Sequence, residues 1–92
     1  MRISDVKKQK ISEQILAFLY SSFPNPLFTS QIAFEIARDE EFVKDLLISL
    51  RKRKLAVEVK KNPKGMEYLR RSRWKMSDEV YSVYRKRQSV GQ

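Results

Sequence analysis

The sequence predicts an α+β fold with a three-helix core, a β-hairpin and a closing C-terminal helix. Apolar residues recur at helical spacing in the first part of the chain, and the spacing changes to strand-like alternation after Leu55. Residues typical of turns and helix caps separate the segments. The chain has 92 residues, of which 41% are hydrophobic, so it can build one small core. We therefore expect a single domain over residues 1–92.

A first helix is expected over about residues 4–22. Ser4 suits the N-cap position, and the charge of Asp5 suits the first turn. Pro24 and Pro26 cannot continue a helix, so the helix ends before them. Its apolar stripe consists of Ile11, Ile15, Phe18 and Leu19. Leu27 and Phe28 follow and are read as a very short strand.

A second helix is expected over about residues 30–37, and a third over about 40–53. Thr29 is the predicted N-cap of the second helix and Asp39 that of the third. The apolar face of the third helix contains Val43, Leu47 and Leu50. Two helices joined by so short a connection form a helix-turn-helix.

A β-hairpin is expected over about residues 55–76. Leu55, Val57 and Val59 alternate with more polar neighbours, as in a strand. The sequence NPKG at 62–65 has turn chemistry, and a second strand containing Trp74 and Met76 follows it. Ser77 then caps a final helix over about residues 77–87.

This order of elements resembles the winged helix-turn-helix of small archaeal and bacterial transcriptional regulators, over roughly residues 8–85. Three features carry the resemblance: Thr29 at the start of the second helix, the spacing Val43, Leu47, Leu50, Leu55, and the ending Trp74, Met76, Ser77. It implies binding to double-stranded DNA, regulation of transcription, and a homodimer joined through the first and last helices. One departure is Lys54, because the family usually has Gly before the Leu that enters the wing. A lysine there requires an uncommon backbone conformation or a different helix end.

Composition narrows the classes of function. The chain contains no histidine and no cysteine, which excludes imidazole and thiolate metal sites and histidine-based triads. No glycine-rich phosphate loop or paired nucleophile and base is present. We therefore do not expect the protein to be an enzyme, and we predict no catalytic residue. We also expect it to bind no metal and no cofactor, and we infer no small-molecule ligand. The N-terminus lacks the apolar core of a signal peptide, and no apolar run approaches about 20 residues. We therefore expect a cytoplasmic protein without a membrane partner.

Charge is divided unevenly along the chain. The net charge is +9, of which residues 1–50 contribute −1 and residues 51–92 contribute +10. Such asymmetry favours a polyanionic partner that meets one end of the molecule. A basic surface that merely keeps the protein soluble is the alternative.

The third helix begins with acids. Its outward face is predicted to hold Glu41, Asp45, Ile48, Ser49 and Lys52, with Lys44 at the flank. Carboxylates in the first turn favour the helix dipole. Alternatively, Glu41 or Asp45 accepts a hydrogen bond from cytosine N4 in the major groove. In either case, affinity for DNA is expected to come mainly from the basic residues that follow.

The predicted DNA contacts lie at the end of the third helix and in the wing. Strand alternation places Arg71, Arg73 and Lys75 on one face and Arg70 on the other. The full predicted set is Lys44, Ser49, Lys52, Arg53, Lys60, Lys61, Lys64, Arg70, Arg71, Arg73 and Lys75.

Other readings remain open at this point. A winged helix can also be a protein-interaction module, here one that docks through the acidic face of its third helix. It can instead coat DNA without regard to sequence. Trp74 is expected in the core rather than stacked on bases. Tyr81 and Tyr84 are expected to form a packing surface, part of which can serve a dimer.

Overall fold

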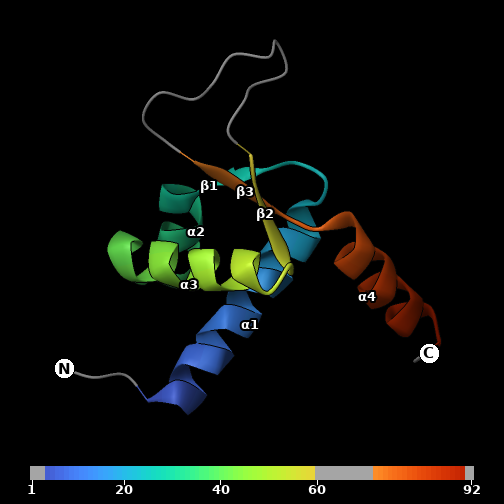
Figure 1. Cartoon of the computed structure of the whole chain (residues 1–92), viewed down its shortest axis with the longest axis horizontal. Coiled ribbons are helices and arrows are strands. Elements are labelled where there is room, and N and C mark those ends of the chain that lie inside the picture. Colours follow the sequence, from blue (N-terminus) through green and yellow to red (C-terminus); the bar gives the residue numbers. More distant parts are fainter. Residues whose placement is uncertain (1–3, 60–71, 91–92) are drawn as a thin grey trace, which may run out of the picture.

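The computed structural model describes residues 4–59 and 72–90, without the side chains of 88–90. In these ranges the predicted α+β class is confirmed: four α-helices accompany a three-stranded antiparallel sheet (Figure 1). The elements in chain order are α1 (Asp5–Ser22), β1 (Leu27–Phe28), α2 (Thr29–Ile36), α3 (Glu40–Lys52), β2 (Ala56–Val59), β3 (Arg73–Met76) and α4 (Asp78–Val90). The predicted turn at 62–65 lies outside the described residues.

Side-chain caps start three of the helices as predicted. The Ser4 hydroxyl accepts a hydrogen bond from the Lys7 amide at 3.2 Å, and the Ser77 hydroxyl accepts one from the Val80 amide at 3.3 Å. The Asp39 carboxylate accepts one from the Phe42 amide at 3.2 Å. Each cap satisfies an amide that the first helical turn leaves without a partner.

The start of α2 differs from the prediction. Thr29 is the first residue of the helix rather than its N-cap, which is Phe28. The Gln31 side chain turns back and accepts a hydrogen bond from the Phe28 amide at 2.8 Å. The Thr29 hydroxyl instead accepts a hydrogen bond from the indole N–H of Trp74. A tertiary contact has therefore taken the group that sequence assigned to the cap.

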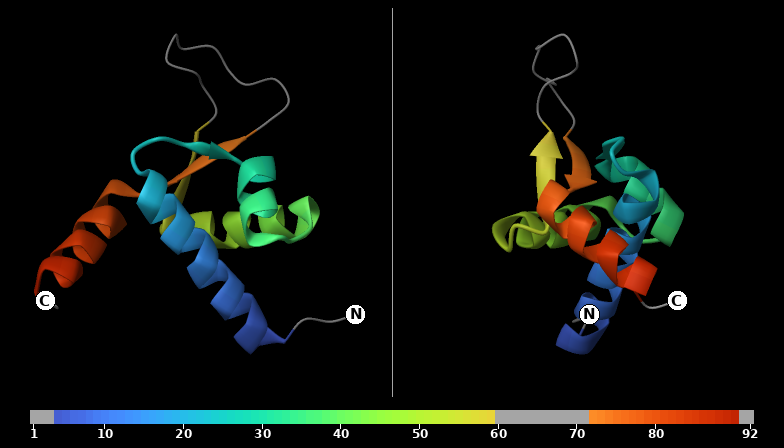
Figure 2. Two further views of the ribbon diagram at one scale, coloured as in Figure 1. Left: turned by 180° about the vertical axis from the view of Figure 1, so that it is seen from behind. Right: turned by 90° about the vertical axis from the view of Figure 1, so that its right-hand side faces the viewer.

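The sheet has the strand order β1-β3-β2 and turns one face toward the helices (Figures 1 and 2). Trp74 and Met76 of β3 are fully buried, and Met76 pairs with the buried Ala56 of β2. Val57 is 40% exposed because it points to the outer face. The inward face of β2 thus carries Ala56 and Glu58, which pair with the buried Met76 and Trp74.

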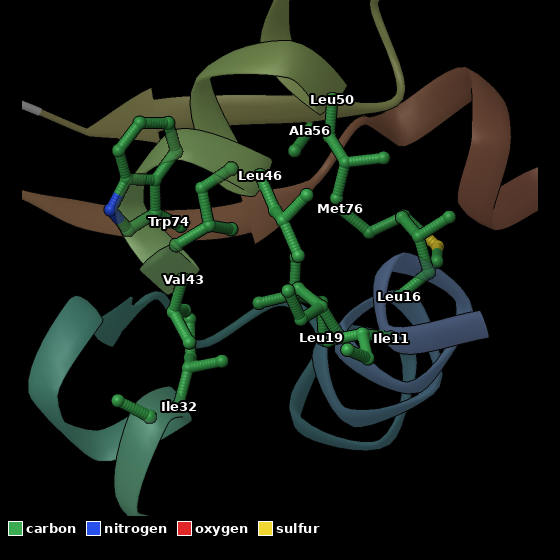
Figure 3. Close-up of a cluster of buried hydrophobic side chains, with 13 residues drawn as sticks. Ile11, Leu16, Leu19, Ile32, Val43, Leu46, Leu50, Ala56, Trp74 and Met76 are labelled. Atoms are coloured by element: carbon green, nitrogen blue, oxygen red, sulfur yellow. The ribbon is translucent and has the colours of Figure 1, made fainter. Parts of the chain in front are cut away.

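One buried cluster joins α1, α2, α3 and the sheet. Figure 3 shows the side chains of Trp74 and Met76 pointing from β3 toward those of the helices. Trp74 is 0% exposed, so its predicted place in the core is confirmed. The cluster consists of Ile11, Ile15, Leu16, Leu19, Ile32, Ala33, Val43, Leu46, Leu47, Leu50, Ala56, Trp74 and Met76.

Aromatic side chains hold α4 in place. The Tyr81 ring stacks on Phe23 with centroids 3.8 Å apart and lies 5.1 Å from the Tyr20 ring. The Tyr84 ring lies 6.0 Å from that of Tyr20. The expected packing role of Tyr81 and Tyr84 is confirmed. As a result, α2 and α4 lie on opposite sides of α1 (Figures 1 and 2).

Of the helices in the described ranges, none combines the length and the hydrophobicity that a membrane span requires.

Candidate nucleic-acid interface

The exposed face of α3 carries several of the predicted DNA contacts. Lys44, Ser49 and Lys52 are all exposed, while Val43, Leu46, Leu47 and Leu50 are buried on the opposite side. Ile48, which the helical wheel placed outward, is half-buried and packs against the core cluster. The difference arises because α3 packs against α1, α2 and β2, so that more than one flank of the helix is covered. Acids at the start and cations at the end of α3 both favour its dipole.

The end of α3 positions Arg53 and Lys54 differently from Lys52. The Arg53 amide still donates to the Ser49 carbonyl at 3.1 Å, and Lys54 then takes a left-handed conformation with φ of 64°. The unusual backbone expected at Lys54 is therefore present. Arg53 lines a groove of about 640 Å³ together with residues of α1 and Tyr84 of α4. Its side chain thus lies toward α1 and α4, whereas Lys52 lies on the outer face of α3.

Arg73 and Lys75 share the outer face of the sheet, as the alternation predicted. The register pairs Val59 with Arg73 and Val57 with Lys75. Both cations are half-buried against aromatic rings. The Arg73 Cζ lies 4.4 Å from the centroid of the Phe28 ring, and the Lys75 Nζ lies 5.5 Å from that of Phe23. Lys75 also pairs with Asp78 at 3.5 Å. These two residues hold β3 to its neighbours, whatever else they contact.

The remaining predicted contacts are Lys60, Lys61, Lys64, Arg70 and Arg71, and all lie outside the described residues. They belong to the wing segment, which we define as residues 60–71. Val59 precedes this segment and Ser72 follows it. Because β2 and β3 pair antiparallel, with Val59 opposite Arg73, both ends of the wing segment meet the same end of the sheet.

A cluster at the root of the wing segment was not foreseen. The Glu58 carboxylate accepts a hydrogen bond from the Arg51 guanidinium through one oxygen and from the Ser72 hydroxyl through the other. These contacts join α3, β2 and the start of β3. Arg51 is not among the predicted DNA contacts. The only available signal was Glu58, a lone acid between apolar residues of a strand.

Phe34 is the second residue that sequence analysis missed. It lies in α2 and is 86% exposed, although its neighbours Ile32 and Ala33 are buried. A single exposed apolar side chain is common in monomeric proteins, but a phenylalanine this exposed is an available contact for a partner.

Among the described residues, no group of three or more carboxylates is placed to hold a metal ion. The groove beside Arg53 contains both apolar and polar side chains, and we assign no ligand to it.

The arrangement of these elements matches several solved structures. MepR of S. aureus in complex with DNA has a TM-score of 0.71 at 19% identity, over 91% of this chain and 69% of that one. A mutant of ZitR from Lactococcus lactis has a TM-score of 0.67 at 18% identity, over 97% of this chain. The transcriptional regulator PcaV from Streptomyces coelicolor, in complex with its natural ligand, has a TM-score of 0.61 at 20% identity, over 90% of this chain.

The chain has the winged helix-turn-helix fold. In this fold α2 and α3 form the helix-turn-helix, and β2 and β3 flank the wing segment. The chain spans 59% of a MepR mutant from a clinical isolate, 56% of ZitR and 51% of PcaV. No protein-family model and no curated protein matches the sequence. At identities near 20%, the shared property is the fold of this winged helix.

Proposed function

We propose that this winged helix binds double-stranded DNA and regulates transcription, with affinity supplied by the wing segment and by the end of α3. The fold and the distribution of charge support the proposal. The wing segment carries five Lys or Arg residues and one Glu. Lys44 and Lys52 are exposed on α3, the helix that lies beside the strand leading into the wing segment. A polyanion across this side of the molecule would meet cations from both elements.

The observation that carries the proposal is that α3 packs against β2, the strand that directly precedes the basic wing segment in the chain. α3 packs against β2, and β2 leads directly into residues 60–71. This order places the basic wing segment next in the chain after a strand that packs against α3, the helix that carries the exposed Lys44 and Lys52. Phosphate contacts position a protein on a duplex and provide most of its non-specific affinity.

A salt titration of binding to a duplex tests this proposal. If about six phosphates are neutralised, log affinity should fall with log salt with a slope near −5. The double variant Arg70→Ala/Arg71→Ala should weaken binding and make the slope less negative by about 2. The matched control is Lys7→Ala/Lys8→Ala at the N-terminal end of α1, which should leave the slope unchanged. Equal losses in both double variants would show only a general effect of net charge.

A regulator is distinguished from an architectural protein by sequence preference. Binding to selected duplexes and to random DNA should be compared at one fixed salt concentration. A regulator is expected to prefer its site by about 10³-fold or more, whereas an architectural protein binds all sequences alike.

A homodimer joined through α1 and α4 forms part of this proposal. Val6 on α1 is 66% exposed, and Val83 on α4 is 52% exposed. Burying these side chains against a second copy would remove apolar surface from water. Mass measurement in solution should give twice the mass of the chain, and Val83→Asp should return it to the monomer mass.

The exposure of the Phe34 side chain supports a second candidate function, that of a protein-interaction module. An aromatic side chain near acidic residues could anchor a basic partner, because interface hot spots are rich in aromatic residues. This function predicts that Phe34→Ala leaves duplex binding unchanged and removes binding to the partner. It also predicts a weak duplex affinity without sequence preference.

A further inference from the structure

Glu58 holds the Arg51 side chain in a defined place between α3 and the sheet. One carboxylate oxygen accepts from the Arg51 guanidinium and the other from the Ser72 hydroxyl. The Glu58 side chain is only 12% exposed, whereas that of Arg51 is 41% exposed. The acid is thus mostly enclosed, and the cation that it holds faces solvent.

The Trp74 ring provides a second support for Arg51. The Arg51 Cζ lies 5.9 Å from the centroid of this ring, which is itself fully buried. An arginine has five N–H donors in a planar fork. Within the described part of the chain, one Arg51 nitrogen is engaged, by Glu58. The other donors remain available on a partly exposed side chain.

Arg51 lies on the side of α3 that faces β2. It follows Lys44 by seven residues, so both cations lie on nearly the same side of α3, about 10 Å apart along its axis. That side adjoins β2, and the wing segment begins directly after β2. In the chain, Glu58 comes shortly before the wing segment and Ser72 comes directly after it. A phosphate that binds at the junction of α3 and β2 would therefore meet Arg51.

We propose that Arg51 contacts a phosphate of the duplex at the junction of α3 and β2, and that Glu58 is the positioning residue that fixes Arg51 for this contact. The inference rests on the proposed DNA binding. Because the guanidinium is already held by a carboxylate and a ring, it loses little side-chain entropy when it binds. Lys44 and Lys52 have no such support in the described ranges and must be ordered on binding.

The first test measures the salt dependence of duplex binding for Arg51→Met. Methionine keeps an apolar stem next to Trp74 and removes the charge. We expect an affinity about tenfold weaker and a slope less negative by about 0.9. Lys8→Met, at an exposed position of α1, is the matched control and should change neither. Arg51→Lys keeps the charge and should keep the wild-type slope. A wild-type slope in Arg51→Met would overturn the inference, and circular dichroism confirms that each variant is folded.

The second test separates positioning from a structural role of Glu58. Glu58→Gln is made both in the wild type and in the Arg51→Met background. A positioning residue matters only when the residue that it positions is present, so the loss of affinity should be about threefold or more greater in the wild type. An equal loss in both backgrounds would mean that Glu58 only stabilises the root of the wing, and this would overturn its positioning role.

Two results distinguish an error about DNA binding as a whole from an error about the role of Arg51. If the wild type binds no duplex, both the proposed function and the phosphate contact are wrong. If the wild type binds with a slope near −5 but Arg51→Met has the same slope, only the role of Arg51 is wrong.

Discussion

The indole Nε1 of Trp74 donates a hydrogen bond to the Oγ1 of Thr29 at 2.8 Å, between residues 45 positions apart in the chain. Both residues are buried, and the bond joins β3 to the first residue of α2. The sheet and the helix-turn-helix are therefore attached to each other by a polar contact inside the core as well as by packing. This contact also explains why Thr29 does not cap α2.

Thr29→Val should destabilise the protein by about 1–3 kcal/mol, because the buried indole N–H would lose its acceptor. Valine has nearly the same shape as threonine, so packing is largely retained. Thr29→Ser keeps the hydroxyl and is expected to cost less than Thr29→Val. Chemical denaturation of both variants measures the difference. An unchanged stability of Thr29→Val would mean that the hydrogen bond contributes nothing net.

Asp39→Ala should cost about 0.5–2 kcal/mol of stability, since the Phe42 amide loses the carboxylate that caps α3. Asp39→Asn keeps an acceptor at the same position and should retain most of the stability. Thermal unfolding of the two variants provides the comparison. Equal losses would assign the effect to charge rather than to the hydrogen bond.

Lys54→Gly should stabilise the protein by about 1 kcal/mol relative to Lys54→Ala. Lys54 has a φ of 64°, a conformation in which a Cβ atom is unfavourable and glycine is not. Both variants remove the same charge, so the difference between their free energies of unfolding measures the cost of the backbone conformation alone. Ala37, with a φ of 56°, offers an independent site, where Ala37→Gly should act in the same direction. A destabilising glycine at both positions would contradict this explanation.

Phe34→Ser should change the free energy of unfolding by less than about 0.5 kcal/mol, because the side chain is 86% exposed. Ile32→Ala, two residues earlier in the same helix, should cost about 2–5 kcal/mol because Ile32 is 0% exposed. Denaturant titration of the pair tests the assigned faces of α2. Similar losses would show that Phe34 is packed.

Glu41→Gln should strengthen binding to duplex DNA at low salt, because it removes a carboxylate from the exposed face of α3. The gain should shrink between about 50 and 200 mM salt as screening increases. If Glu41 instead accepts a hydrogen bond from a cytosine, the variant would lose affinity for its selected site while binding to random DNA stays the same. Comparing the two duplexes at both salt concentrations decides between these roles.

Local patterns predicted much of the fold because they act within a few residues. The apolar spacing of α1 and α3, the caps at Ser4, Asp39 and Ser77, and the unusual backbone at Lys54 were all apparent from neighbouring residues. The short strand at Leu27–Phe28 was also predicted. Alternation correctly placed Arg73 and Lys75 on one face of β3. The DNA-binding set itself stays a prediction, and part of it lies in the wing segment.

The tertiary structure decided which partner each polar or half-buried side chain has. Ile48 faces outward on a helical wheel, yet it is half-buried and packs against the core cluster. Thr29 has the chemistry of a cap, yet Trp74 uses its hydroxyl. Arg51 and Glu58 are seven residues apart on different elements, so no local pattern announces their ion pair. Sequence determined the elements, their order and the excess of positive charge in the second half, since these depend on residue type and spacing. Only the packing of α3 against the sheet determined where the Arg51 side chain is held, because such contacts depend on how separate elements meet in space.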